Sequence, residues 1–395
     1  MLSAFSAHIT GGGFSPEGVP AELPALTEKA LLHKILPMVM DSALPLFSDE
    51  KNLRAAKILT ACVVAEQSAK NYEFLKIYSA LRQKGIAPLC VKGVVCAALY
   101  PEPDFRSCSD ADLLLSENDF SACCAYLTDC GFKLADGSEE SFEAGFRSES
   151  GFKIEIHRLL FSPDSRFFSG FNAHFENAFA APAKVVFFGE DILTLPPTQN
   201  MLYLALHAFK HFAAAGVGIR QICDMALFAE KYGGEIDWSA LFFACSEFHA
   251  DCFLNAVLIT AQRFFAPEIE KYFTLIPGFD FKLDISHFLQ DIMGGAVYGA
   301  ADRNRLHSAN ITLSRLEEEN SGHAAAVLRS VFPPAKTLED RYPYLKKHRF
   351  LLPVAWASRT LKFLHAPASS KEILEIGKKR EDILREYKVI FKNLR

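Results

Sequence analysis

Two aspartates one residue apart, Asp110 and Asp112, head the apolar run "DADLLL". In a β-strand, residues i and i+2 point to the same face, so both carboxylates share one face while Ala111 and Leu113 lie on the other. A carboxylate that enters a core is costly unless a partner compensates its charge. A pair of divalent cations is such a partner, because two carboxylates whose Cα atoms lie about 6.6 Å apart along a strand can bridge two neighbouring ions.

A third carboxylate, Glu155, lies in the alternating segment "FKIEIH", which predicts a second strand. If the two strands pair, Glu155 joins the aspartates, and three clustered acidic groups repel one another unless a divalent metal offsets them. Asp110, Asp112 and Glu155 are therefore predicted to hold two Mg²⁺ ions, with Mn²⁺ as the alternative. His157 is predicted to orient Glu155 or to cap the end of the strand. The alternatives are a turn-and-cap role for the two aspartates and a Glu155 that faces solvent.

Phosphate-binding residues are predicted on both sides of a short helix that precedes the aspartates. Lys92 and Gly93 lie at a strand-to-helix junction, where glycine allows close backbone approach and a helix N-terminus favours an anion. Arg106 and Ser109 come just before the acidic pair and could add phosphate contacts. Alternatively, Lys92 only extends its ammonium to solvent, and Arg106 pairs with an acidic residue shortly before it.

A later helical segment carries further polar residues with regular spacing. His207 and His211 lie four residues apart, but neither an H-E-x-x-H motif nor a third ligand accompanies them, so zinc is not expected. Together with Lys210 they form either a packed polar face or part of an acceptor or phosphate pocket. Arg220 and Asp224, also four apart, form either an ion pair on one helix or part of the lining of a cleft.

The elements that position these residues change type twice along the chain. Residues 1–85 are predicted to be a flexible start, through about residue 24, followed by a helical segment. Residues 86–197 alternate between short strands and helices, and residues 198–395 are helical. The predicted fold is α+β: a small mixed sheet with flanking helices, an N-terminal helical segment and a C-terminal all-helical domain.

Three segments together resemble a known family: "VKGVVCAALYPEPDFRSCSDADLLL", "FKIEIHRLL" and "LALHAFKHFAAAGVGIRQICDMALF". Their order is similar to that in the uncharacterised nucleotidyltransferase family of the DNA polymerase β-like superfamily. The resemblance implies that residues 86–197 form a nucleotidyltransferase core. Asp110, Asp112 and Glu155 would be its metal carboxylates, and Arg220 and Asp224 would line the cleft.

The reaction that the resemblance implies is Mg²⁺-dependent transfer of a nucleoside monophosphate. The donor is a nucleoside triphosphate such as ATP, and the acceptor is a hydroxyl-type group on a small molecule or a protein. Lys92 and Arg106 would neutralise charge on the phosphates, and Glu155 would help to deprotonate the acceptor. The alternative is a catalytically inactive nucleotide-binding or regulatory module of the same fold. Lys92-Gly93 stands where the superfamily has Gly-Ser, which favours that alternative.

Composition excludes several other classes of protein. The 395-residue chain has a formal net charge of −5, so a broad basic surface for nucleic acid is not expected. No run approaches 18 apolar residues, so membrane insertion is not expected. The ten cysteines lack C-x-x-C spacing and the N-terminus lacks the pattern of a signal peptide. A cytoplasmic protein with reduced thiols is therefore predicted.

Overall fold

The computed structural model describes residues 1–12, 22–299, 305, 309, 312–313, 316, 332–338, 342–364 and 370–390. The chain divides into two compact units. The first comprises Met1–Ala208 with Gly218–Ile285, and the second comprises Phe209–Val217 with Ser286–Arg395. The boundaries predicted near residues 85 and 197 follow changes in secondary structure, and they stay a prediction about domains.

One seven-stranded sheet lies in the first unit, in the order β3-β4-β5-β2-β1-β7-β6. Its strands are β1 Leu89–Val91, β2 Asp110–Leu114, β3 Lys133–Gly137, β4 Glu143–Arg147, β5 Lys153–His157, β6 Ala183–Phe187 and β7 Glu190–Thr194. The pairs β2–β5 and β1–β7 are parallel and the other pairs are antiparallel. A mixed sheet combined with many helices confirms the predicted α+β class.

The first unit also contains a set of helices. They are α1 Leu2–Thr10, α2 Leu23–Leu32, α3 Leu36–Ala43, α4 Glu50–Gln83, α5 Gly93–Ala97, α6 Glu117–Asp129, α7 Pro197–Ala214, α8 Ile219–Tyr232, α9 Trp238–Ser246 and α10 Asp251–Phe264. Five short 3₁₀ segments accompany them: η1 Leu44–Leu46, η2 Pro103–Phe105, η3 Phe168–Phe175, η4 Pro267–Leu275 and, in the second unit, η5 Val297–Gly299. The last residues of α7 belong to the second unit.

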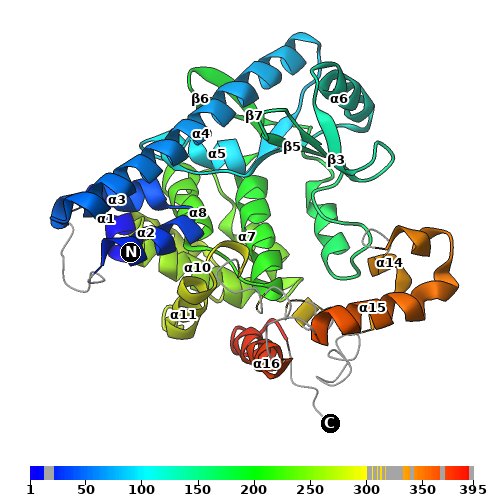
Figure 1. Cartoon of the computed structure of the whole chain (residues 1–395). Helices are drawn as coiled ribbons and strands as arrows, with labels where there is room; N and C mark the ends of the chain where they lie inside the picture. The colour runs from blue at the N-terminus through cyan, green and yellow to red at the C-terminus, as the bar shows by residue number, and fades with distance from the viewer. Residues whose placement is uncertain are drawn as a thin grey trace. The chain divides into compact units, whose positions relative to one another are not determined.

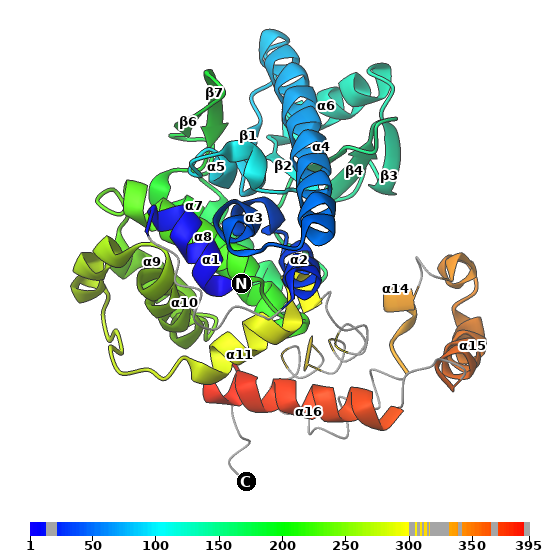
Figure 2. The ribbon, with the colours of Figure 1, turned by 60° about the vertical axis from the view of Figure 1, so that its left-hand side comes forward.

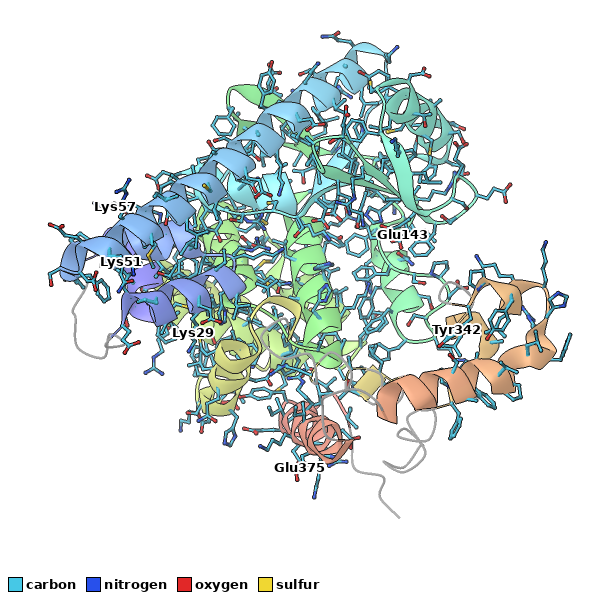
Figure 3. All side chains as sticks on the ribbon, in the orientation of Figure 1. Lys29, Lys51, Lys57, Glu143, Tyr342 and Glu375 are labelled. Atoms are coloured by element: carbon cyan, nitrogen blue, oxygen red, sulfur yellow. The ribbon has the colours of Figure 1, made fainter. Side chains whose placement is uncertain are left out.

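The long helix α4 covers one face of the sheet (Figure 1). The ring of Phe74 lies 6.5 Å from the ring of Phe187 on β6. The hydroxyl oxygen of Tyr78 accepts a hydrogen bond from the Leu193 amide of β7 at 2.8 Å. On the outer side of the same helix, Lys51 and Lys57 are exposed (Figure 3). The helix is therefore amphipathic, and its buried side fixes β6 and β7.

Alternation along β2 and β5 separates the core from the polar side of the sheet. Ala111, Leu113, Ile154 and Ile156 are all buried. Their carboxylate-bearing neighbours lie at the intervening positions of the same strands, as the period of two requires. Figure 2 shows β1 and β2 beside helix α5, which packs on both strands. The apolar side of the two acidic strands thus anchors them in the core.

Several elements differ from the sequence-based predictions. Residues 2–10 form helix α1 instead of a flexible start, because Phe5 is buried with its ring 4.9 Å from that of Phe265. The polar segment before β4 forms the additional strand β3, which pairs with β4. Within the predicted helical region, α9 and α10 are separate helices, because the chain turns at His249, which has a φ of 56°.

The second unit is helical in its described residues. Its further elements are α11 Ser286–Gly295, α14 Ala335–Leu338, η6 Pro343–Lys346, η7 Arg349–Leu351, α15 Leu352–Leu364 and α16 Ser370–Glu386. The buried Asp291 carboxylate pairs with Arg305 at 2.7 Å and also with Arg380. Helix α16 is the last helix of the region predicted to be helical, and residues 391–395 lie outside the described residues. Among the described residues, no helix combines the length and the apolar character that a membrane span requires.

Candidate active site

Strand register brings two carboxylates and an imidazole together. In the parallel pair β2–β5, Asp112 lies directly opposite Glu155, and His157 follows two positions later on the same strand face. One ligand atom from each of these three residues lies within 4.8 Å of the other two. Asp112 is only 2% exposed. The three residues therefore form one compact polar cluster, which we call the acidic cluster.

The charge of Asp112 is compensated on one side only. Lys92 Nζ lies 2.8 Å from Asp112 Oδ1, and His157 Nε2 lies 3.4 Å from the same oxygen. Burial alone would raise the pKa of Asp112, but the Lys92 ammonium and His157 lower that pKa to about 2. Asp112 Oδ2 is buried and has no hydrogen-bond partner in the part of the chain that the structure describes. The unpartnered oxygen of this buried carboxylate is therefore available as a ligand atom for a cation.

The donor set fits a divalent cation. Asp112 and Glu155 supply hard oxygen atoms, and His157 supplies a nitrogen atom of the kind that Mn²⁺ and other transition metals accept more readily than Mg²⁺. Asp110 lies on the same face of β2 and is half-buried. Burial raises the pKa of Asp110, and the Asp112 carboxylate adds to that rise. Among the described residues, Asp110 is outside the group of three, so its role as a metal ligand stays a prediction.

Neighbouring charges hold Glu155 and His157 in place. Lys153 Nζ lies 2.6 Å from Glu155 Oε1 and 2.8 Å from Asp136 Oδ2. Glu143, which is labelled in Figure 3, begins β4, and its Oε2 lies 3.6 Å from His157 Nδ1. Each imidazole nitrogen thus faces a carboxylate, since Nε2 is also 3.8 Å from Glu155 Oε2. This arrangement orients the ring of His157 toward Asp112 and Glu155.

Lys92 has an unusual backbone conformation. Its φ is 46° and its ψ is −121°, a combination that L-residues rarely adopt. This conformation accompanies an Nζ that lies next to Asp112 and 3.1 Å from His207 Nε2. Gly93 is buried beside it and begins α5, which has only five residues. The ammonium of Lys92 is therefore committed to the acidic cluster and to His207.

Arg106 and Asp224, which were predicted to act separately, form one buried ion pair. Arg106 Nε and Nη2 each donate to one oxygen of the Asp224 carboxylate at 2.7 Å, and the Tyr100 hydroxyl donates to the same carboxylate at 2.9 Å. Burial alone would lower the pKa of Arg106, but Asp224 raises it well above its usual value. Two guanidinium nitrogens thus engage Asp224, and the third, Nη1, donates to Cys108 Sγ at 2.6 Å. The pair ties the segment before β2 to helix α8.

The remaining predicted residues divide between the two units. Ser109 is exposed and accepts a hydrogen bond from Lys34, and Arg220 donates to the backbone just before it. Lys210 and His211 belong to the second unit, whereas the acidic cluster lies in the first. Lys34 was not predicted as a site residue. No motif or regular spacing marks Lys34 as a site residue in the sequence, because it lies in a loop between two N-terminal helices.

Carboxylates from two adjacent strands, with an open buried oxygen, are a ligand set that can hold a divalent metal, as sites of phosphoryl transfer do. The chain belongs to the family of uncharacterised nucleotidyltransferases, because residues 20–266 match that family. The predicted family and enzyme class are thereby confirmed. The match covers every residue of the acidic cluster and both members of the Arg106–Asp224 pair.

Comparison with curated proteins gives no match. Among solved structures, the lincosamide antibiotic adenylyltransferase LnuA with bound lincomycin is 12% identical, with 40% of this chain and 94% of that chain covered and a TM-score of 0.29. A TM-score of that size does not establish a shared fold.

Proposed function

We propose that this nucleotidyltransferase moves a nucleoside monophosphate from a nucleoside triphosphate to a hydroxyl-type acceptor on a small molecule or a protein. The observation that carries the proposal is the register of β2 and β5, which places Asp112 opposite Glu155 beside an unpartnered buried oxygen. Divalent cations bound there would activate the attacking oxygen and stabilise the leaving pyrophosphate. The family membership supports the same class of reaction.

In this proposal each residue of the site has a distinct role. Asp112 and Glu155 hold the metal, and Asp110 adds a carboxylate on the side of β2 nearest the preceding segment. Lys92 neutralises Asp112, which keeps the buried carboxylate charged and ready to bind a cation. Arg106 positions the segment before β2 through Asp224 rather than by contact with substrate. Lys153 contacts Oε1 of Glu155, and the other oxygen, Oε2, lies 3.8 Å from His157 Nε2 and is suited to accept the acceptor's proton.

The metal in this proposal is Mg²⁺ or Mn²⁺, and His157 decides between them. We expect wild-type protein to bind Mn²⁺ more tightly than Mg²⁺, because an imidazole nitrogen suits Mn²⁺ better. His157→Asn should reduce this preference about tenfold. Competition of Mg²⁺ against bound Mn²⁺, followed by electron paramagnetic resonance, measures the preference. His174→Asn, which alters a histidine paired with Glu247 at 3.2 Å, is the matched control. An unchanged preference in His157→Asn would exclude His157 as a ligand.

Thermal unfolding with each nucleoside triphosphate tests the proposed function. A ligand that binds only the folded protein raises the midpoint by mass action. We expect at least one triphosphate to raise the midpoint when Mg²⁺ or Mn²⁺ is present and not when EDTA replaces the metal. If no triphosphate shifts the midpoint of folded protein with either metal, the proposal is wrong. A shift without release of pyrophosphate in the presence of candidate acceptors favours the inactive nucleotide-binding module instead.

A further inference from the structure

Three cationic side chains converge on residues 107–109, the segment that leads directly into β2. The contacts are Arg220 Nη1 to the Ser107 carbonyl, Lys70 Nζ to the Cys108 carbonyl at 3.5 Å, and Lys34 Nζ to the Ser109 hydroxyl. The three cations come from three different elements of the first unit: helix α8, helix α4 and the loop after α2. We call Lys34, Lys70 and Arg220 the cationic cluster.

The cationic cluster is more charged than its contacts require. Neutral donors would satisfy two carbonyls and a hydroxyl, whereas like charges held together repel one another. Burial lowers the pKa of Lys34, and the charge of Arg220 lowers it further. The nearby acids compensate only part of this charge: Glu66 pairs with Lys70 at 2.6 Å, and Asp110 attracts Lys34.

Arg220 carries a second indication that the cluster has an additional partner. It is 5% exposed, and its Nε is buried without a hydrogen-bond partner among the described residues. It also lies in the first turn of α8, where the helix dipole disfavours a cation. An anion beside Arg220 would satisfy its Nε and offset both costs.

Lys34 occupies a backbone position that favours glycine. It follows the end of α2 with a φ of 57°, in the left-handed region where helices commonly end in glycine. A lysine at this position lowers local stability, yet its side chain reaches Ser109 beside the first predicted metal ligand. A locally unfavourable residue whose charged group reaches a candidate site is characteristic of binding residues.

We propose that the cationic cluster binds the phosphate groups of the nucleotide donor next to Asp110. This inference rests on the proposed function and extends it, because it assigns the pyrophosphate portion of the donor to Lys34, Lys70 and Arg220. Phosphate oxygens would supply part of the negative charge that the cationic cluster lacks, next to the carboxylates that bind the cation. The cluster thus supplies the phosphate contacts that the sequence predicted for Arg106.

Calorimetric titration with inorganic pyrophosphate in EDTA tests this subsite without metal or nucleotide. We expect wild-type protein to bind pyrophosphate and Lys34→Gly to bind it at least about tenfold more weakly, because a charge-assisted contact is lost. Glycine fits the backbone of residue 34, so loss of binding cannot be attributed to unfolding. Lys34→Arg should retain binding. The matched control is Lys57→Met on the exposed side of α4, which should bind as the wild type does.

The outcomes separate this subsite from the proposed function. A wild type that does not bind pyrophosphate, or a Lys34→Gly variant that binds it as tightly as the wild type, overturns the subsite. If either result accompanies metal-dependent binding of a triphosphate, only the subsite is wrong. Asp112→Asn should retain pyrophosphate binding, because the cationic cluster needs no metal. Loss of pyrophosphate binding in a folded Asp112→Asn variant would also contradict this subsite.

Discussion

Asp112→Asn is expected to lower the affinity for Mn²⁺ by about 100-fold or more and metal-dependent pyrophosphate release by about 1000-fold. The substitution keeps the shape of the side chain and removes the one buried carboxylate with an open oxygen among the residues that the structure describes. A metal at such a site contributes several kcal/mol to charge stabilisation, and about 1.4 kcal/mol corresponds to a tenfold change. Electron paramagnetic resonance of added Mn²⁺ measures the affinity directly, without knowledge of the acceptor.

The control for this prediction changes a carboxylate of the same sheet. Asp191 on β7 is exposed and pairs with Lys184 at 2.8 Å, far from any contact with the acidic cluster in the described structure. Asp191→Asn should bind Mn²⁺ as the wild type does. Unfolding midpoints of both variants separate loss of the metal site from loss of the fold. If the Asp112→Asn variant is folded and binds Mn²⁺ as the wild type does, the acidic cluster is not the metal-binding site.

Arg106→Met is expected to lower the free energy of unfolding by about 3–5 kcal/mol, because it leaves the Asp224 carboxylate buried without its cation. The Tyr100 hydroxyl would remain as a partner, but a single neutral donor does not replace a bidentate ion pair. Urea denaturation followed by fluorescence of Trp238, which lies in the same unit, measures the change. A variant with unchanged stability but weakened triphosphate binding would instead indicate that Arg106 binds phosphate, as the sequence predicted.

A double substitution tests the physical reason for that loss. Arg106→Met with Asp224→Leu removes both charges, so it should be less destabilising than Arg106→Met alone. Lys184→Met is the matched control, because it breaks an exposed ion pair with Asp191 and should cost about 0–1 kcal/mol. If the double variant is as unstable as the sum of the two single variants, charge pairing is not what holds Arg106 and Asp224 together.

Alternation of side chains was sufficient to predict the acidic strands from the sequence. The apolar residues between Asp110, Asp112 and Glu155 required the carboxylates to share the opposite face, and the structure has this arrangement in β2 and β5. The pairing of these two strands was only a condition of the prediction, since period-two patterns do not specify which strands are neighbours. The pattern predicted His157 as a residue that orients Glu155, and strand register also brings His157 within 3.4 Å of Asp112.

Contacts between distant parts of the chain could not be predicted in the same way. Arg106 and Asp224 are 118 residues apart, and nearer acidic residues were equally plausible partners by sequence. Lys34 and Lys70 come from an N-terminal stretch that was predicted to be helical, and its local pattern reports only amphipathicity. The positive φ angles of Lys34 and Lys92 are likewise invisible to pattern analysis, because lysine is not a residue that predicts such a conformation.

The ion pair between Arg106 and Asp224 also bears on the order in which the protein can fold during synthesis. All seven strands end by Thr194, so the ribosome delivers the complete sheet before it delivers helix α8. Until helix α8 has emerged, the buried Arg106 guanidinium lacks its Asp224 partner. The segment before β2 is then not yet tied to that helix. The nascent sheet should therefore stay open and available to chaperones, and the metal-binding strands should reach their final register only after Asp224 has emerged.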